Sequence, residues 1–240
     1  YAYSHGINYF DTAYPYHGGT SEEFTGKALS KYPRDSYFLA TKFPIWAAET
    51  EADLERIFNE QLQRTQAGYF DFYLLHALNA ERVDKIQKLK VYEFFAQKKA
   101  EGKIRHLGFS FHDTPAVLER ICSLYEWDFA QIQLNYLDWE MQDAKGQYEV
   151  LTKHGIPVIV MEPVRGGALA HPCDESVRIF EEAAPGKSAA SWAIRFAESL
   201  PNVQVVLSGM STMDQIRDNV ATMSDFHPLT DEDRAVIEKA

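Results

Sequence analysis

The sequence predicts an α/β protein built as a parallel (β/α)8 TIM barrel, and three observations support this. Short, almost continuously apolar runs alternate with longer amphipathic segments, which is the pattern of parallel strands covered by helices. No G-x-G-x-x-G motif follows any of these runs, so the usual nucleotide signature of the competing doubly wound open sheet is missing. The chain has 240 residues, 45% of them hydrophobic, which is enough for one barrel-sized core.

Seven apolar runs are expected to form the strands. They are Ile7–Asp11, Tyr37–Thr41, Phe72–His76, His106–Ser110, Gln131–Asn135, Pro157–Met161 and Val203–Leu207. Several segments between them have helical periodicity, and the clearest are Glu51–Gln66, Val83–Glu101, Pro115–Leu124 and Lys187–Ser199. Strands and helices that alternate in this way form βα units with right-handed crossovers.

The first residues, Tyr1 to Gly6, resemble the last turn of a helix that stops at a glycine. A chain that starts at the end of a helix lacks one βα unit, and seven strands plus one make eight. We therefore expect a barrel whose first strand–helix unit lies ahead of Tyr1. No linker, charge block or low-complexity segment divides residues 1–240, which predicts a single domain.

The charge balance is acidic, since 24 Lys and Arg against 35 Asp and Glu give a net charge of −11. Such a surface repels phosphate backbones and anionic lipids, so neither nucleic acid nor a membrane is expected as a partner. The two cysteines, Cys122 and Cys173, form no CxxC pair, which suits a cytoplasmic protein. No metal is expected within residues 1–240, because no H-x-H or H-x-x-x-H spacing occurs.

Ionisable groups stand at the ends of three successive predicted strands. The first run ends in Asp11, Lys42 directly follows the second, and the third ends in His76. Catalytic groups of such barrels stand at the C-terminal ends of strands, so these three side chains are expected at one mouth. Alone, each has an ordinary explanation as a helix cap, a solvated loop lysine or a core histidine. Their joint occurrence favours a catalytic site.

Motifs along essentially the whole chain resemble the aldo-keto reductase family. They are Asp11 with Tyr16, Gly18–Glu23, Lys42, Leu74-Leu75-His76, Gly108-Phe109-Ser110, Gln131–Tyr136, Glu162–Gly167 and Ser208–Asn219. The stretches Lys42–Trp46, Leu75–Asn79 and Gly108–His112 are similar to the subgroup whose members often carry a ferredoxin-like C-terminal extension. That extension needs cysteine clusters, so a 4Fe-4S cluster is expected only if such an extension follows residue 240.

The resemblance implies an NAD(P)H-dependent enzyme that reduces small-molecule aldehydes or ketones. Tyr16 is implied as the general acid, Lys42 as the ammonium that favours its phenolate form, and Asp11 as the partner that holds Lys42. His76 is implied as the hydrogen-bond donor that orients and polarises the carbonyl oxygen. The nicotinamide cofactor supplies the hydride.

The resemblance also implies the cofactor-binding residues. Ser110, Gln133 and Asn135 are expected at the nicotinamide carboxamide; Glu162, Pro163, Val164, Arg165, Gly166 and Gly167 at the pyrophosphate; and Ser208, Gly209, Ser211, Gln215 and Asn219 at a phosphate beside the last helix. Ser211, Gln215 and Asn219 fall at one-turn spacing, which places them on one helix face.

The expected cofactor is NADPH, with NADH also possible. Many relatives grip the 2′-phosphate of NADPH with a lysine and an arginine. This chain has Gly209 and Gln215 at the matching positions, and helical spacing turns Arg217 elsewhere. The sequence therefore leaves the selectivity between the two cofactors open.

Two other functions are open alternatives. A class I aldolase would use Lys42 as a Schiff-base nucleophile, and a non-catalytic NADPH-binding regulatory subunit would keep the fold without the chemistry. The complete set of four catalytic residue types favours the reductase over both. Trp46 and His112 are expected near the substrate pocket, but the substrate is not readable because specificity in this fold comes from variable loops. The oligomeric state is likewise open.

Overall fold

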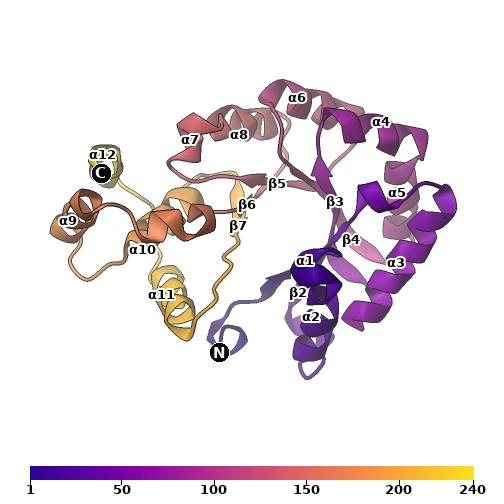
Figure 1. Cartoon of the computed structure of the whole chain (residues 1–240), viewed down its shortest axis with the longest axis horizontal. Helices are drawn as coiled ribbons and strands as arrows, with labels where there is room; N and C mark the ends of the chain where they lie inside the picture. The colour runs from indigo at the N-terminus through magenta and orange to yellow at the C-terminus, as the bar shows by residue number, and fades with distance from the viewer. The chain divides into compact units, whose positions relative to one another are not determined.

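A computed structural model describes residues 1–240 as seven strands separated by helices (Figure 1). The strands are β1 (Tyr9–Asp11), β2 (Phe38–Phe43), β3 (Phe70–Leu78), β4 (Ile104–Phe111), β5 (Phe129–Gln133), β6 (Val158–Met161) and β7 (Val203–Val206). They follow one another in the order β1-β2-β3-β4-β5-β6-β7, and the pairs β1–β2, β2–β3, β3–β4 and β6–β7 are parallel. The predicted parallel α/β fold is confirmed, whereas the eighth strand stays a prediction.

The segments between the strands are mostly helical. The α-helices are α1 (Tyr16–Gly19), α2 (Ser21–Leu29), α3 (Glu51–Thr65), α4 (Ala80–Lys88), α5 (Val91–Ala100), α6 (Pro115–Leu124), α7 (Asp138–Met141), α8 (Ala144–Lys153), α9 (Asp174–Ala183), α10 (Ala189–Glu198), α11 (Met213–Ser224) and α12 (Asp231–Lys239). Short 3-10 helices are η1 (Tyr3–His5), η2 (Arg34–Ser36), η3 (Ile45–Ala47) and η4 (Arg165–Ala170). None of the helices has the length and apolar character that crossing a bilayer requires. No cluster of three or more His, Cys, Asp or Glu side chains is arranged to hold a metal ion.

Two predicted elements differ from the structure. The predicted helix Val83–Glu101 is two helices, α4 and α5, because Lys90 adopts a left-handed conformation with φ 50°. The predicted strand Gln131–Asn135 lies too far along the chain, since β5 ends two residues earlier. The Asn135 side chain accepts hydrogen bonds from the backbone amides of residues 137 and 138 at 3.1 and 2.8 Å, and such local bonds stabilise a turn instead of a strand.

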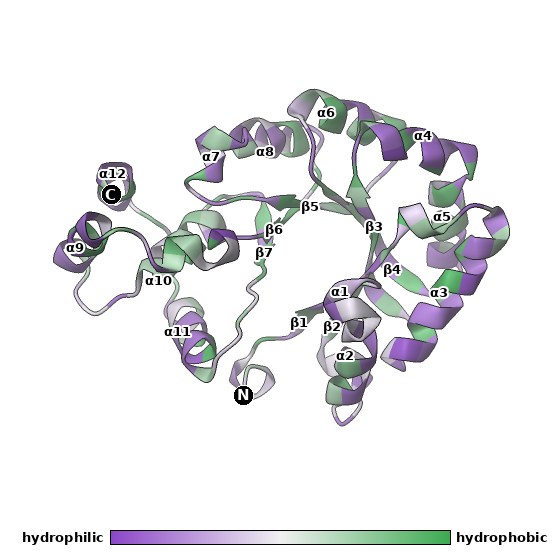
Figure 2. Ribbon diagram, viewed as in Figure 1, coloured by the Kyte–Doolittle hydropathy of each residue, from purple (hydrophilic) through white to green (hydrophobic).

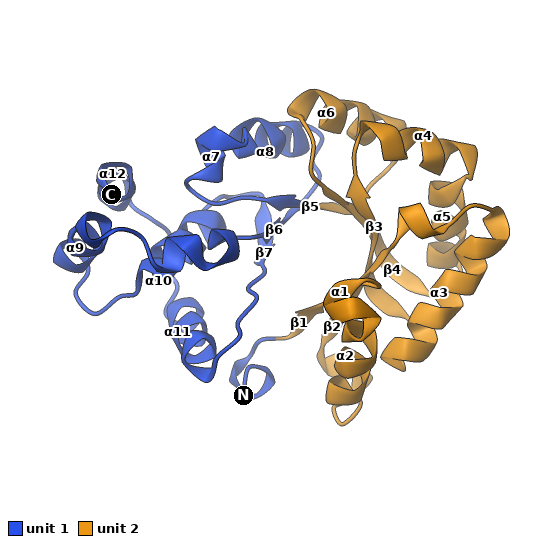
Figure 3. Cartoon of the chain, viewed as in Figure 1, with its two compact units in different colours: residues 1–7, 132–240 blue, residues 8–131 orange.

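The chain divides into two compact units (Figure 3). Residues 8–131, orange and labelled unit 2 in Figure 3, are called the first unit here because they come first along most of the chain. In this unit, helices α2 to α6 lie along one face of strands β1 to β4 (Figure 1). Residues 1–7 and 132–240 form the second, which contains the parallel pair β6–β7 and helices α7 to α12. This division does not test the expectation of a single domain over residues 1–240, which stays a prediction.

A cluster of aromatic side chains forms the core of the first unit. Phe43 of β2 and Tyr73 of β3 pack on Phe95 of α5 with ring centroids 4.9 and 4.8 Å apart, and Phe58 of α3 lies 5.3 Å from Tyr73. All four rings are at most 1% exposed. Helix α3 correspondingly shows hydrophobic and hydrophilic patches side by side in Figure 2. Large buried rings contribute strongly to stability, so this cluster fixes β2 and β3 beneath the two helices.

Gly108 of β4 lies close against Phe129 of β5. A Cβ added there would lie 2.4 Å from the carbonyl oxygen of Phe129 and 2.6 Å from its ring. We expect Gly108→Ala to lower the free energy of unfolding by about 1–3 kcal/mol, the usual cost of overpacking a core. Gly68→Ala is the matched control, since a Cβ there meets nothing within 4 Å. Urea unfolding measures both variants, and equal stabilities would contradict the close packing.

Candidate active site

The strand register places three of the predicted catalytic residues on one face of the sheet. Asp11 pairs with Ala40, and Lys42 pairs with Leu74. Side chains two residues apart on a strand point to the same face. Lys42 lies two residues beyond Ala40, and His76 lies two residues beyond Leu74, so Asp11, Lys42 and His76 share that face.

Lys42 and Asp11 form an ion pair inside the first unit. The Lys42 side chain is 1% exposed and the Asp11 side chain 14%. Nζ of Lys42 donates hydrogen bonds to Oδ1 of Asp11 and, at 3.0 Å, to the carbonyl oxygen of Thr12. Burial raises the pKa of the Asp11 carboxyl, and the adjacent ammonium opposes that rise. A buried charge without a partner is strongly destabilising, so the pair fixes the position of the ammonium.

Tyr16 lies in a sharp turn between β1 and α2. The three residues that follow it, His17–Gly19, have positive φ angles of 53°, 65° and 88°, a left-handed run that two glycines make possible without steric cost. The turn brings the ring centroid of Tyr16 to 4.7 Å from Nζ of Lys42. The same ring meets that of His76 edge-on, with the centroids 5.8 Å apart.

His76 stands at an irregularity near the end of β3. Between two paired positions the chain advances by three residues in β3, from 75 to 78, but by two in β4, from 109 to 111. Such a bulge leaves one extra residue unpaired and re-aims the neighbouring side chains. Ala77, the residue after His76, has a φ of 53°.

The imidazole of His76 is neutral at neutral pH. Burial, the largest cause, and the charges of Lys42, Arg82 and His112 together lower its pKa from 6.5 to about 3. A neutral imidazole carries one N–H, so it can donate one hydrogen bond. Nδ1 of His76 and Oδ2 of Asp11 are buried without a hydrogen-bond partner, and groups of this kind are frequent where a site receives a polar ligand atom.

The two predicted pocket residues lie close to these groups. Trp46, in η3 after β2, has its ring centroid 5.2 Å from that of His76 and is 43% exposed. His112 follows β4 directly, is exposed, and acts electrostatically on His76. Residues 8–131 therefore contain the four predicted catalytic side chains, and the partly exposed indole of Trp46 lies beside them.

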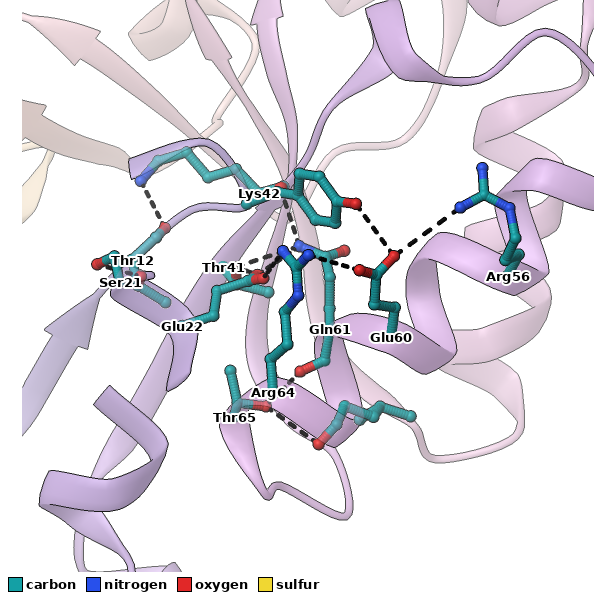
Figure 4. A network of polar contacts seen from close by, with 12 residues as sticks. Thr12, Ser21, Glu22, Thr41, Lys42, Arg56, Glu60, Gln61, Arg64 and Thr65 are labelled. Carbon is teal, nitrogen blue, oxygen red and sulfur yellow. Dashed lines mark hydrogen bonds and ion pairs between the residues drawn. The ribbon is translucent and has the colours of Figure 1, made fainter. Parts of the chain in front are cut away.

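A buried carboxylate that the sequence did not reveal supports the strand end at Lys42 (Figure 4). Glu22 of α2 is fully buried, and its Oε1 accepts hydrogen bonds from Thr41 at 2.6 Å and from the Gln61 amide at 2.7 Å. The same Gln61 amide donates to the carbonyl oxygen of Lys42 at 3.0 Å, and Tyr73 donates to Gln61 at 2.6 Å. This network fixes the backbone of β2 at Lys42.

In the second unit, two of the expected carboxamide ligands are held by a buried aspartate that the sequence also did not reveal. Oδ2 of Asp138, which is 0% exposed, accepts hydrogen bonds from Gln133 at 2.8 Å and from Asn135 at 2.6 Å. The Asn135 amide also donates to the carbonyl oxygen of Glu162 at 3.0 Å. Nε of Arg165 lies 3.2 Å from Oδ1 of Asp138. The only sequence signal was the i, i+3 spacing of Asn and Asp directly after a strand.

The loop Glu162–Gly167 has the backbone form of an anion-binding nest. Positive φ angles occur at Glu162 (56°), Arg165 (50°), Gly166 (62°) and Gly167 (95°), and Pro163 and Val164 lie between them. Backbone N–H groups in turns of this kind converge on an anion. The carboxylate of Glu162 accepts a hydrogen bond from the Gly166 amide. The amides of Arg165 and Gly167 donate to the carbonyl oxygens of Glu162 and Val164 at 3.0 Å each, so three amides of this loop are used within the chain.

One expectation for helix α11 is wrong. Ser211 does not share a helix face with Gln215 and Asn219, because α11 begins after Thr212. Thr212 and Gln215 form a capping box, which satisfies free amides at the helix start. The Gln215 side chain accepts from the amides of Ser211 at 2.7 Å and Thr212 at 3.2 Å.

The other residues expected at the phosphate end differ in exposure. Asn219 is buried and donates to the hydroxyl of Ser208 at 2.8 Å. Gly209 is exposed, with open space around its Cα. Arg217 pairs with Asp214 at 2.9 Å. Helix α11 therefore offers no arginine that is free of a carboxylate partner.

Comparisons place the chain among the NAD(P)H-dependent oxidoreductases that act on small-molecule carbonyl compounds. The Aldo/keto reductase family model matches residues 1–240, so the chain belongs to the aldo-keto reductase family. L-galactose dehydrogenase of Arabidopsis thaliana is 28% identical over 95% of this chain and 77% of its own length. The NADH-specific methylglyoxal reductase of Escherichia coli (strain K12) is 25% identical over 91% and 79%.

Solved structures agree with this assignment. The holo form of the aldo-keto reductase AKR11C1 from Bacillus halodurans superposes with a TM-score of 0.80 at 29% identity, covering 98% of this chain and 83% of its own. An aldo-keto reductase from Klebsiella pneumoniae in complex with NADPH has the same fold, with a TM-score of 0.76 at 23% identity over 99% and 81%. The resemblance that the motifs indicated is confirmed at the level of the family.

The lowered pKa of His76 predicts a pH dependence of stability. An unfolded histidine takes up a proton below pH 6.5, whereas the folded one does so only near pH 3. The stability is therefore present above pH 6.5 and lost as the pH falls toward 3. From about pH 7.5 to about pH 5, the free energy of unfolding is expected to drop by up to about 2 kcal/mol more than in His76→Gln. Parallel slopes for the two proteins in denaturant unfolding would contradict this.

Proposed function

We propose that this chain reduces aldehydes or ketones to alcohols with NADPH, using Tyr16 as the general acid. The observation that carries the proposal is the position of the Tyr16 ring, 4.7 Å from the Lys42 ammonium and edge-on to the neutral His76. A phenol beside a cation can give up its proton more readily. A neutral imidazole beside the same phenol can donate a hydrogen bond to the oxygen that receives the proton.

Each of the four side chains has one task in this proposal. The nicotinamide, when bound, supplies a hydride to the carbonyl carbon. Tyr16 transfers its hydroxyl proton to the carbonyl oxygen, which completes the alcohol, and Lys42 stabilises the phenolate that remains. His76 donates to the same oxygen and orients the carbonyl. Asp11 holds the Lys42 ammonium in place.

The proposed cofactor-binding residues differ in how many of their polar atoms are already used within the chain. Ser110 and Gln133 are the better candidates for the carboxamide, because all four hydrogen-bonding positions of Asn135 are used within the chain. Asn135 then acts by holding Glu162. The nest Glu162–Gly167 would take the pyrophosphate, and Ser208, Gly209, Ser211, Gln215 and Asn219 a phosphate at the end of the cofactor.

The family resemblance supports NADPH, but the chain itself offers little for the 2′-phosphate. Gln215 is engaged in the helix cap and Arg217 in an ion pair. The NADH-specific methylglyoxal reductase that is similar to this chain supports NADH as an alternative cofactor. We therefore propose NADPH as the cofactor with weak selectivity over NADH.

The ion pair argues against the aldolase alternative. A Schiff base forms when a neutral amine attacks a carbonyl carbon, but Nζ of Lys42 is buried against Asp11 and donates to Thr12 as well. Borohydride treatment with a carbonyl substrate is expected to leave Lys42 unmodified. A covalent adduct on Lys42, found by mass spectrometry, would favour the aldolase.

Replacing the proposed acid tests the mechanism directly. Tyr16→Phe is expected to lower kcat for carbonyl reduction by about 100- to 10,000-fold, the usual contribution of a general acid. NADPH binding, followed by nucleotide fluorescence, is expected to persist, because the ring and its contacts remain. Unchanged turnover in this variant would remove Tyr16 as the acid. Loss of both turnover and NADPH binding would indicate a structural role.

A substrate panel tests the reaction class and the cofactor. Aldehydes and ketones, including methylglyoxal, are tested for reduction with NADPH and with NADH, and L-galactose and D-arabinose are tested for oxidation with NADP+ and with NAD+. The names of similar proteins suggest these three compounds. We expect the kcat/KM values for the two cofactors to differ by less than about 10-fold, which corresponds to about 1.4 kcal/mol. A preference for NADPH far above this value would reveal a contact to the 2′-phosphate that α11 does not provide.

A further inference from the structure

Arg82 of α4 has no part in the proposed chemistry, yet its contacts converge on His76. Its Nη1 donates to the carbonyl oxygen of Ala77, the residue after His76, at 2.5 Å. Its guanidinium also lies 5.0 Å from the ring centroid of Trp46. The Trp46 ring is in turn 5.2 Å from the imidazole. One arginine therefore contacts both the backbone beside His76 and the ring packed against it.

The backbone that Arg82 holds is strained. Ala77 has a φ of 53°, a conformation that residues with a Cβ rarely adopt unless their surroundings impose it. The Ala77 amide donates to Oγ of Ser110 at 2.8 Å, and its carbonyl accepts from Arg82. Both polar groups of this peptide are thus held by side chains from other elements, and the bulge that aims His76 depends on them.

Arg82 forms no ion pair, which distinguishes it from other arginines of the first unit. Arg34 and Arg105 both pair with Asp71, and Arg120 pairs with Asp84. A guanidinium is planar, donates several hydrogen bonds in fixed directions and stacks on aromatic rings. Arg82 donates to the carbonyl oxygen of Ala77 and stacks on the indole of Trp46. The shape of the guanidinium therefore matters more at this position than an ion pair.

We propose that Arg82 is a positioning residue that holds the bulge at Ala77 and the indole of Trp46 so that His76 keeps the orientation needed to donate to the carbonyl oxygen. This inference rests on the proposed function, in which His76 is that donor. Arg82 itself touches neither the substrate nor the reacting atoms.

The charged groups that act on His76 come from several elements and agree in sign. Lys42 of β2, Arg82 of α4 and His112 after β4 all lower its pKa, in addition to burial. The Tyr16 ring meets it edge-on from α1. Removing Arg82 therefore takes away one of these cations as well as the two contacts that fix the ring.

Two variants separate geometry from charge. Arg82→Met removes both, whereas Arg82→Lys keeps the charge but loses the planar fork and the stacking. Both are expected to lower kcat for carbonyl reduction about 10- to 100-fold, the effect of misplacing a catalytic group by about 1 Å, with the Kd for NADPH unchanged. Arg120→Met is the matched control, because it removes an exposed arginine whose ion pair contributes little. Wild-type kcat in Arg82→Lys, with the contact between the His76 and Trp46 rings unchanged, would overturn the proposal.

A second measurement needs neither cofactor nor substrate. In the free protein, nuclear Overhauser contacts between the rings of His76 and Trp46 are expected to weaken in both Arg82 variants and to persist in Arg120→Met. The pKa of His76, from the same spectra, is expected to rise in Arg82→Met more than in Arg82→Lys. Persisting ring contacts in both Arg82 variants would overturn the positioning role. Lost contacts with unchanged turnover would support it and instead refute the proposed role of His76.

Discussion

The buried ion pair between Lys42 and Asp11 is the interaction on which the rest of the site depends. Removing two charges from water costs several kcal/mol for each ion unless they meet each other in good geometry. This geometry requires β1 to pair with β2 in one register and the Thr12 carbonyl to accept from Nζ of Lys42. It also requires the hydrogen bonds of Glu22 and Gln61 that hold the end of β2. Tyr16 and His76 then take their positions around the ammonium that this arrangement has fixed.

The sequence predicted those parts of the site that depend on strand periodicity. Asp11, Lys42 and His76 stand at or just after the ends of apolar runs, and parallel strands bring such ends to the same edge of a sheet. The position of Tyr16 does not follow from periodicity, because it depends on a left-handed turn over residues 17–19. Only the family resemblance indicated it. Local backbone conformation also determines two helix starts. The left-handed conformation of Lys90 precedes α5, and the capping box of Thr212 begins α11.

Two of the residues whose roles the sequence did not reveal have partners that are distant in sequence or belong to the backbone. Glu22 meets Gln61 across 39 positions, and Arg82 meets a carbonyl oxygen and the face of an indole. A pattern of residue types cannot show such contacts, because hydrogen bonds to buried groups are set by tertiary packing. Supporting residues of this kind determine how well the visible catalytic groups are aimed, and they are the part of a site that structure adds to sequence.

The four proposed catalytic side chains all belong to residues 8–131, whereas the nest Glu162–Gly167 and the cap of α11 belong to residues 132–240. In the proposed function, the proton chemistry and the binding of the cofactor phosphates therefore belong to separate stretches of the sequence. Substitutions in the second stretch can alter which dinucleotide is preferred while the acid and its supports stay untouched. Proteins with this arrangement can therefore change their cofactor preference while the proposed catalytic residues stay the same.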